Sequence, residues 1–460
     1  MALSAELLLY STGIFLLCQI VFLPAGHLAA AYLGANLSSR IQLLLAYGIS
    51  LLSFSLFFAA GLWLRISIPT IQILLMSAIS VLLGLWIVQK KYAALFQKDA
   101  AWFYLVWLLY FVLTLAATAF PRGDFREITA HTSMMLANLP IDNHIPYNFA
   151  RYIVEHIDPN KLEVVPTWRA SDRGPLGGLA AALFFILLGE KEQLPWLLTS
   201  PGLYFVCQAV VSFLNLLSLL GVWVLAVELL DRTSARYAVI LTGINYFYFL
   251  NIFFSWPKFL MAYFLLCALY LWQRLGLRLW AGIFFAGAML SHDSAAFCLA
   301  VSGLLLLYEA AKNAALAIKS GQTVFLHRSR EFMRTLLPMG IGFAATMAPW
   351  VLYKRFYSPP SPRLLYLHLF CDKDTSTVKS SFCEALRAYL RDNSWNEIIG
   401  TRVYNLWYPF DPYPSLIRIR DLWQSPAVLL NHFHMPVFFQ FTWGAGGAAF
   451  ILFLLGLYWL

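Results

Sequence analysis

Residues 174–189 read GPLGGLAAALFFILLG, an apolar stretch between two polar regions. It is shorter than the roughly 20 residues that a helix needs to cross a hydrocarbon core. Whether it crosses decides the sidedness of the remaining fold, because one additional crossing reverses every later loop. The chain is 60% hydrophobic with a mean hydropathy of +0.69, whereas soluble proteins are nearer half apolar. This composition predicts a polytopic membrane protein.

Longer apolar segments recur along the chain, and they predict an all-α, polytopic transmembrane helical bundle with about 11 crossings. Two long polar loops interrupt them and contain most of the acidic residues. The predicted crossings are approximately 8–33, 42–64, 69–88, 101–120, 203–230, 237–254, 258–273, 279–291, 294–311, 335–353 and 437–459. The predicted parts are N-terminal transmembrane helices at 1–100, a core at 101–353 with an outer loop at 121–202, a second loop at 354–436 and a C-terminal transmembrane helix at 437–460.

Basic residues in the short connections predict the orientation, because cytoplasmic loops carry an excess of Lys and Arg. One side carries Arg40, Lys90, Lys91, Lys98, Arg232, Arg236, Arg274, Arg278, Lys312, Lys319, Arg328, Arg330 and Arg334. The other side carries Arg65 and Lys258. This bias holds only if 174–189 does not cross, so we expect it to be a re-entrant or interfacial helix and both long loops to face outward. No basic groove or recognition motif accompanies the net charge of +9, so no nucleic-acid partner is expected.

The first outer loop begins with the acidic and basic residues of AFPRGDFREITAH (119–131). Apolar residues at helical spacing after it predict short amphipathic helices on the membrane surface. Asp124 stands where the chain leaves the membrane, so it is a candidate general base or the N-cap of the next helix. Arg122 and Arg126 can bind phosphate or extend to the interface. Glu127 can share a helical face with Asp124 or be solvated.

Three further stretches, read together with Asp124, carry a family resemblance. They are DRGPLGGLAAALFFILLGE (172–190), NIFFSWPKFLMAYFLL (251–266) and AGAMLSHDSAAF (286–297). Their order resembles that of the type C glycosyltransferases, polytopic enzymes that use polyprenyl-phosphate-linked sugars. The resemblance implies that Asp124 is the catalytic base and that Asp172 and Arg173 bind substrate. The chain departs from the family in having Gly174 in place of a proline and four apolar segments, rather than one, before the catalytic loop.

Other ionisable residues are predicted at outer helix ends and in the second loop. Lys258 is a candidate phosphate contact or an interfacial lysine. His292 and Asp293 can orient the sugar donor, hold a divalent ion or cap a helix. Arg402 lies among aromatic residues that fit sugar stacking and phosphate binding or an interfacial aromatic belt. Cys371 and Cys383 form a disulfide in an oxidising compartment or remain unpaired thiols.

These observations together predict an inverting hexosyl- or pentosyltransferase in a bacterial inner membrane, with an extracytoplasmic active site. Its expected partners are the lipid bilayer, a polyprenyl-phosphate-linked sugar and a glycan, lipid or protein acceptor. No ligand spacing is diagnostic for a metal, so a divalent cation stays an open alternative. Two other functions also stay open: a transporter or flippase for a lipid-linked sugar, and a non-catalytic membrane subunit of a polysaccharide assembly complex.

Overall fold

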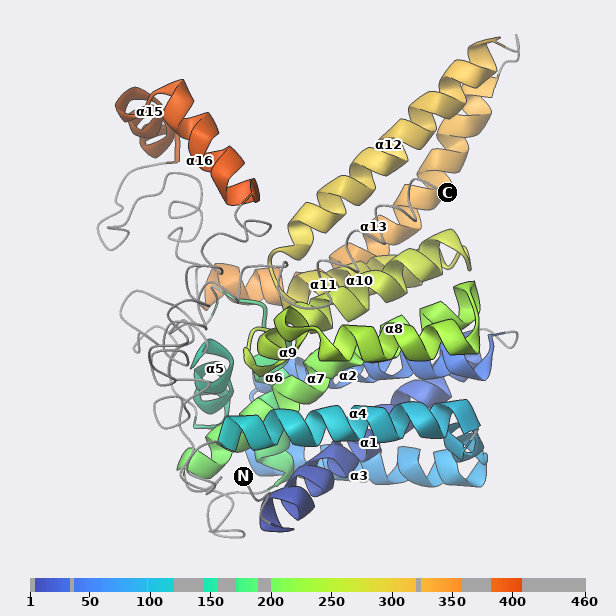
Figure 1. Ribbon diagram of the computed structural model, residues 1–460, viewed down its shortest axis with the longest axis vertical. Coiled ribbons are helices and arrows are strands. Elements are labelled where there is room, and N and C mark those ends of the chain that lie inside the picture. Colours follow the sequence, from blue (N-terminus) through green and yellow to red (C-terminus); the bar gives the residue numbers. More distant parts are fainter. Residues whose placement is uncertain are drawn as a thin grey trace, which may run out of the picture.

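The computed structural model describes residues 5–33, 37–96, 98–119, 144–155, 171, 173–188, 200–319, 324–357 and 382–407. Within these ranges every element of secondary structure is a helix (Figure 1). The predicted all-α class is therefore confirmed for the described part of the chain.

The first five elements are four long helices and, between the third and the fourth of them, a short 3₁₀ helix. Their boundaries follow from local chemistry, because the hydroxyls of Ser38 and Ser67 accept hydrogen bonds from the first turns of the helices that they precede, as N-cap residues do. The left-handed residues Arg65 (φ 57°) and Lys90 (φ 53°) follow the ends of two of these helices. The elements are α1 (Ala5–Leu33), α2 (Ser39–Trp63), α3 (Ile68–Val88), the 3₁₀ helix η1 (Lys91–Phe96) and α4 (Lys98–Ala119).

The remaining helices include a long central one, α7, which packs against α1, α4, α6, α8 and α10. They are α5 (Ile145–Val154), α6 (Leu176–Leu187), α7 (Ser200–Leu229), α8 (Arg232–Ile244), α9 (Tyr246–Phe253), α10 (Lys258–Gln273), α11 (Arg278–Ser291), α12 (Ala295–Lys319), α13 (Val324–Phe356), α15 (Phe382–Asp392) and α16 (Trp395–Trp407). Within 121–202, the loop predicted to face outward, α5 is amphipathic as predicted and buries Tyr147 and Phe149.

Six described helices are long and apolar enough to cross a membrane: α1, α2, α3, α4, α7 and the second half of α13. Several other predicted crossings are shorter, since α10 has 16 residues and α11 has 14. The predicted segment 237–254 is divided between α8 and α9, and 437–459 lies outside the described residues. An integral membrane protein is therefore supported, while the number of about 11 crossings stays a prediction.

Aromatic side chains of α1, α2, α4 and α7 fill the centre of the bundle. The rings of Trp107 and Phe213 stack with centroids 4.9 Å apart, and those of Phe103 and Trp223 stack at 4.8 Å. All four side chains are fully buried. Such ring pairs contribute beyond the apolar area that they bury, so the N-terminal helices form part of the same core as α7.

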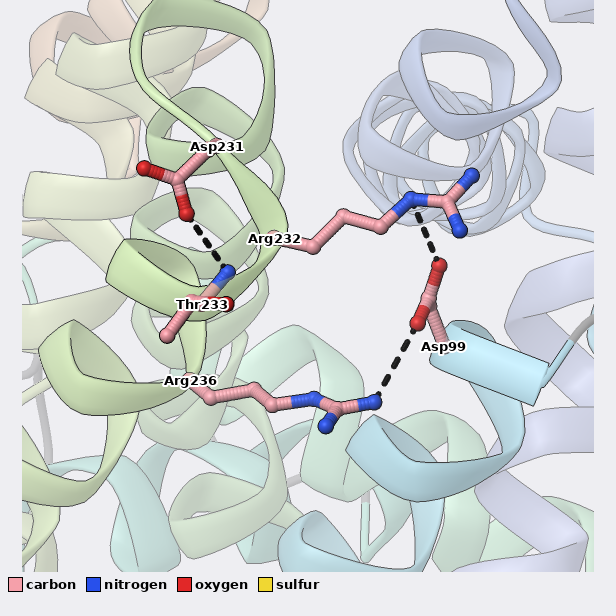
Figure 2. A network of polar contacts seen from close by, with 5 residues as sticks. All are labelled: Asp99, Asp231, Arg232, Thr233 and Arg236. Carbon is pink, nitrogen blue, oxygen red and sulfur yellow. Dashed lines mark hydrogen bonds and ion pairs between the residues drawn. The ribbon is translucent and has the colours of Figure 1, made fainter.

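An ion-pair cluster joins α4 to α8 at one end of the bundle. The carboxylate of Asp99 lies 3.0 Å from Arg232 Nε and 3.3 Å from Arg236 Nη2 (Figure 2). Asp231 begins α8 as its N-cap and accepts the Thr233 amide at 2.7 Å (Figure 2). Both arginines belong to the side predicted to be cytoplasmic, and this compartment stays a prediction.

Candidate functional site

The interruption between α9 and α10 places polar and aromatic groups beside the middle of α7. Residues 254–257 separate the two helices, and Pro257 precedes the first residue of α10, Lys258. The backbone carbonyls of Phe254 and Trp256 accept hydrogen bonds from Asn215. Asn215 is about 22 Å along α7 from Ser200, at 1.5 Å per residue. The interruption therefore lies well inside the length of the bundle.

Two predicted substrate-binding residues meet at the ring of Trp256. The guanidinium carbon of Arg173 lies 4.1 Å from the ring centroid, and Lys258 Nζ lies 5.0 Å from the same centroid. Lys258 Nζ also lies 5.3 Å from the ring of Phe254. Arg173 is only 9% exposed. The negative faces of the aromatic rings partly compensate these cations for their lost hydration, which keeps two positive charges side by side.

Gly174 brings Arg173 against the end of α11. A Cβ at position 174 would lie 2.4 Å from the Leu290 carbonyl oxygen and 2.5 Å from that of Ser291. These contacts are too short for any side chain, proline included. The glycine at this position is thus required by the close approach of two backbones, and it places Arg173 next to the turn that contains His292.

His292 caps the C-terminus of α11, with its ring centroid 5.6 Å from that of Trp256. Its Nδ1 accepts the Ser294 amide at 3.2 Å, so the proton of the neutral ring is on Nε2. Nε2 is buried and has no hydrogen-bond partner among the described residues. Burial, with the positive charges of Lys258 and Arg173, lowers the pKa of His292 from 6.5 to about 3. His292 is therefore a neutral hydrogen-bond donor at physiological pH.

Asp293 adds one acid to the same turn. Burial raises the pKa of its carboxyl group, while Lys354 of α13 and Arg173 act in the opposite direction. Lys354 Nζ lies 5.3 Å from the ring of Trp350. Of the three roles predicted for His292 and Asp293, metal binding finds no support in the described ranges, where no group of three His, Cys, Asp or Glu side chains could hold an ion.

Three helices begin at this cluster: α6, α10 and α12. Gly177, in the first turn of α6, would place a Cβ 3.5 Å from Pro257. The Ser294 hydroxyl, beside the start of α12, lies 3.2 Å from Met261 Sδ in the first turn of α10. The N-cap residues of α6 and α10 are Pro175 and Pro257, and neither forms a side-chain capping bond, although Asn215 of α7 accepts the Leu260 amide in the first turn of α10. Helix N-termini carry unpaired N–H groups and partial positive charge, so their convergence adds to the charge of Arg173 and Lys258.

The remaining predicted site residues are not part of this cluster in the described structure. Arg122, Asp124, Arg126, Glu127, Asp172 and Cys371 lie outside the described residues, so their roles stay predictions. Cys383 is exposed on α15. Arg402 lies on α16, which forms no extensive packing contact with α6, α10 or α11 in the described ranges.

Sequence reasoning missed Asn215 and Lys354. The signal for Asn215 was present, because Ser212, Asn215 and Ser218 recur every three residues in an otherwise apolar helix. Lys354 follows an apolar run and resembles any interfacial lysine in sequence.

The comparisons with known proteins give no match: no protein family, no curated protein and no solved structure matches this chain.

Proposed function

We propose that this chain is a membrane glycosyltransferase that moves a sugar from a polyprenyl-phosphate donor to an envelope acceptor at the extracytoplasmic face. The observation that supports this most is the meeting of Arg173, Lys258 and three helix N-termini inside a membrane protein. Ionisable residues inside membrane proteins often mark substrate sites, and two cations beside three helix N-termini attract an anion. An anionic group attached to a lipid fits this arrangement and reaches the site through the membrane.

In the proposed reaction, Asp124 accepts a proton from the acceptor hydroxyl or amine. The acceptor attacks the anomeric carbon, the bond to the phosphate oxygen breaks, and the sugar is transferred with inversion. Negative charge increases on the departing lipid phosphate. Arg173, Lys258 and the Nε2–H group of His292 are suited to stabilise this charge, because they are fixed before the reaction in a poorly hydrated site.

The glycine at 174 is compatible with an active enzyme. In the sequence, this departure from the family pattern left a non-catalytic subunit open as an alternative. The contacts with the Leu290 and Ser291 carbonyls give the glycine a packing role that involves no loss of chemistry. A transporter for the same lipid remains the alternative that experiment must distinguish.

A single reconstitution distinguishes these functions. Purified protein in proteoliposomes is given a radiolabelled polyprenyl-phosphate hexose or pentose and a membrane extract as acceptor. We expect labelled product, none with Asp124→Asn, and a loss of kcat/KM on the order of 10²-fold with Lys258→Met, as for removal of one preorganised charge donor. Lys90→Met, an exposed lysine at the other end of the bundle, is the matched control.

Three results would count against the proposal. Movement of the label across the membrane without transfer would identify a transporter. Full activity of Asp124→Asn would remove the assigned base, and neither transfer nor translocation would favour the non-catalytic subunit.

A further inference from the structure

The central helix α7 carries polar side chains that face the protein interior. Ser212, Asn215 and Ser218 are spaced by three residues and are at most 4% exposed. Burying polar groups costs free energy unless hydrogen bonds compensate them. Ser218 shares a hydrogen bond with Tyr248 of α9 at 2.8 Å, and Asn215 contacts the segment that follows α9.

Asn215 satisfies three backbone groups at the break between α9 and α10. Its Nδ2 donates to the carbonyls of Phe254 at 3.2 Å and Trp256 at 3.5 Å, and its Oδ1 accepts the Leu260 amide at 3.2 Å. Helix ends leave such carbonyl and amide groups without intrahelical partners. Away from water, a side chain must supply the missing partner. The one fully buried amide of Asn215 thus connects the end of α9 to the start of α10.

We propose that Asn215 is a positioning residue that fixes Trp256 and Lys258 relative to Arg173. Asn215 bonds the Trp256 carbonyl on one side of Pro257 and the Leu260 amide on the other, and Lys258 lies between these two bonded residues. Arg173 depends on the same anchor, because its guanidinium group stacks on the Trp256 ring. The proposal rests on the proposed function only for its kinetic test.

An apolar residue at 215 would remove these bonds while filling similar space. With Asn215→Leu, the Phe254 and Trp256 carbonyls and the Leu260 amide lose the Asn215 amide as a partner. The turn is then expected to rearrange toward other partners, which moves Lys258 Nζ off the aromatic rings. Ser218→Ala removes a hydroxyl from the same face one turn away and leaves the turn's hydrogen bonds intact, so it is the matched control.

Lysine NMR measures whether Lys258 Nζ has moved off the aromatic rings, without any assumption about activity. Reductive methylation with ¹³C-formaldehyde labels the lysines, and Lys258→Arg identifies the Lys258 signal by its disappearance. Because Lys258 Nζ lies over the Phe254 and Trp256 rings, its methyl signal should be displaced upfield from those of exposed lysines. We expect Asn215→Leu to abolish this displacement and Ser218→Ala to preserve it.

A second variant keeps the proposal testable if Asn215→Leu does not fold. Asn215→Asp retains an acceptor for the Leu260 amide and weakens the donation to the two carbonyls, so its Lys258 signal should lie between those of the other variants. An unchanged upfield signal in whichever variant folds would overturn the proposal.

The kinetic test separates positioning from the proposed function. With a polyprenyl-phosphate sugar, Asn215→Leu should lower kcat/KM by on the order of 10²-fold, as expected for a reacting group displaced by about 1 Å, and Ser218→Ala should leave it near normal. If Asn215→Leu loses the upfield shift of the Lys258 signal but binds polyprenyl phosphate with unchanged affinity, the positioning role is upheld and the phosphate site is rejected. A retained displacement with lost activity would reject the positioning role instead.

Discussion

At the scale of single residues, Gly174 permits a close backbone contact at the site because it has no side chain. Replacing Gly174 with Ala would force the Cβ against the carbonyls of Leu290 and Ser291. We expect a loss of stability of about 1–3 kcal/mol, as for other overpacked positions, and a larger relative loss of transfer. Gly13→Ala is the control, since nothing lies within 4 Å of a Cβ there. Thermal unfolding in detergent measures the difference, and equal melting temperatures for both variants would contradict the packing role.

His292 gives a pH-dependent prediction at the same scale. Its pKa is lowered from 6.5 to about 3 in the folded chain, so the unfolded chain takes up this proton first as pH falls. The associated stability is complete above about pH 6.5 and declines toward pH 3, with a slope of at most about 1.4 kcal/mol per pH unit. His292→Gln should remove this contribution in denaturant titrations at several pH values, whereas His144→Gln should not. An unchanged acid slope in His292→Gln would show that another group is responsible.

At the scale of elements, the contact between α4 and α8 depends on Asp99. Asp99 is 13% exposed at its side chain, and its partners Arg232 and Arg236 are 67% and 42% exposed. Exposed ion pairs contribute little, so Asp99→Asn should destabilise the protein by only about 1 kcal/mol. The loss should diminish at high salt, because salt screens exposed charges.

The matched control for this pair is Asp392→Asn, since Asp392 and Arg391 form an ion pair on the exposed surface of α15. That variant should melt like the unchanged protein in the same thermal scan. A large, salt-insensitive loss in Asp99→Asn would mean that the carboxylate has a role beyond joining the two helices.

At the scale of the whole molecule, the two ends of α3 test the predicted sidedness. Arg65 precedes α3 and Lys90 follows it, both are exposed, and both have positive φ. In a background without Cys371 and the exposed Cys298 and Cys383, Arg65→Cys should react with an impermeant maleimide in spheroplasts and Lys90→Cys only after lysis. The reverse pattern would invert the topology and place the site on the cytoplasmic side.

The N-terminal helices also contact the helices that form the candidate site. The Tyr263 hydroxyl of α10 donates to the Leu44 carbonyl of α2, and it accepts the Gly48 amide at 3.0 Å. Gly48 would also bring a Cβ to 2.6 Å from Phe284 of α11. The N-terminal helices thus support the helices that carry Lys258 and His292.

The sequence by itself determined the helical class, the membrane setting and the residue types Arg173, Lys258 and His292, because hydropathy, helix length and charge bias are local properties. The sequence did not show which interruptions between helices lie next to one another in space. Arg173 and Lys258 are brought to one tryptophan ring only by the packing of α6, α7, α10 and α11. The role of Asn215 and the need for glycine at 174 were equally invisible, since both depend on backbone groups supplied by distant segments. Tertiary structure decided these features because hydrogen bonds at a helix break and close backbone contacts form only once the helices have packed.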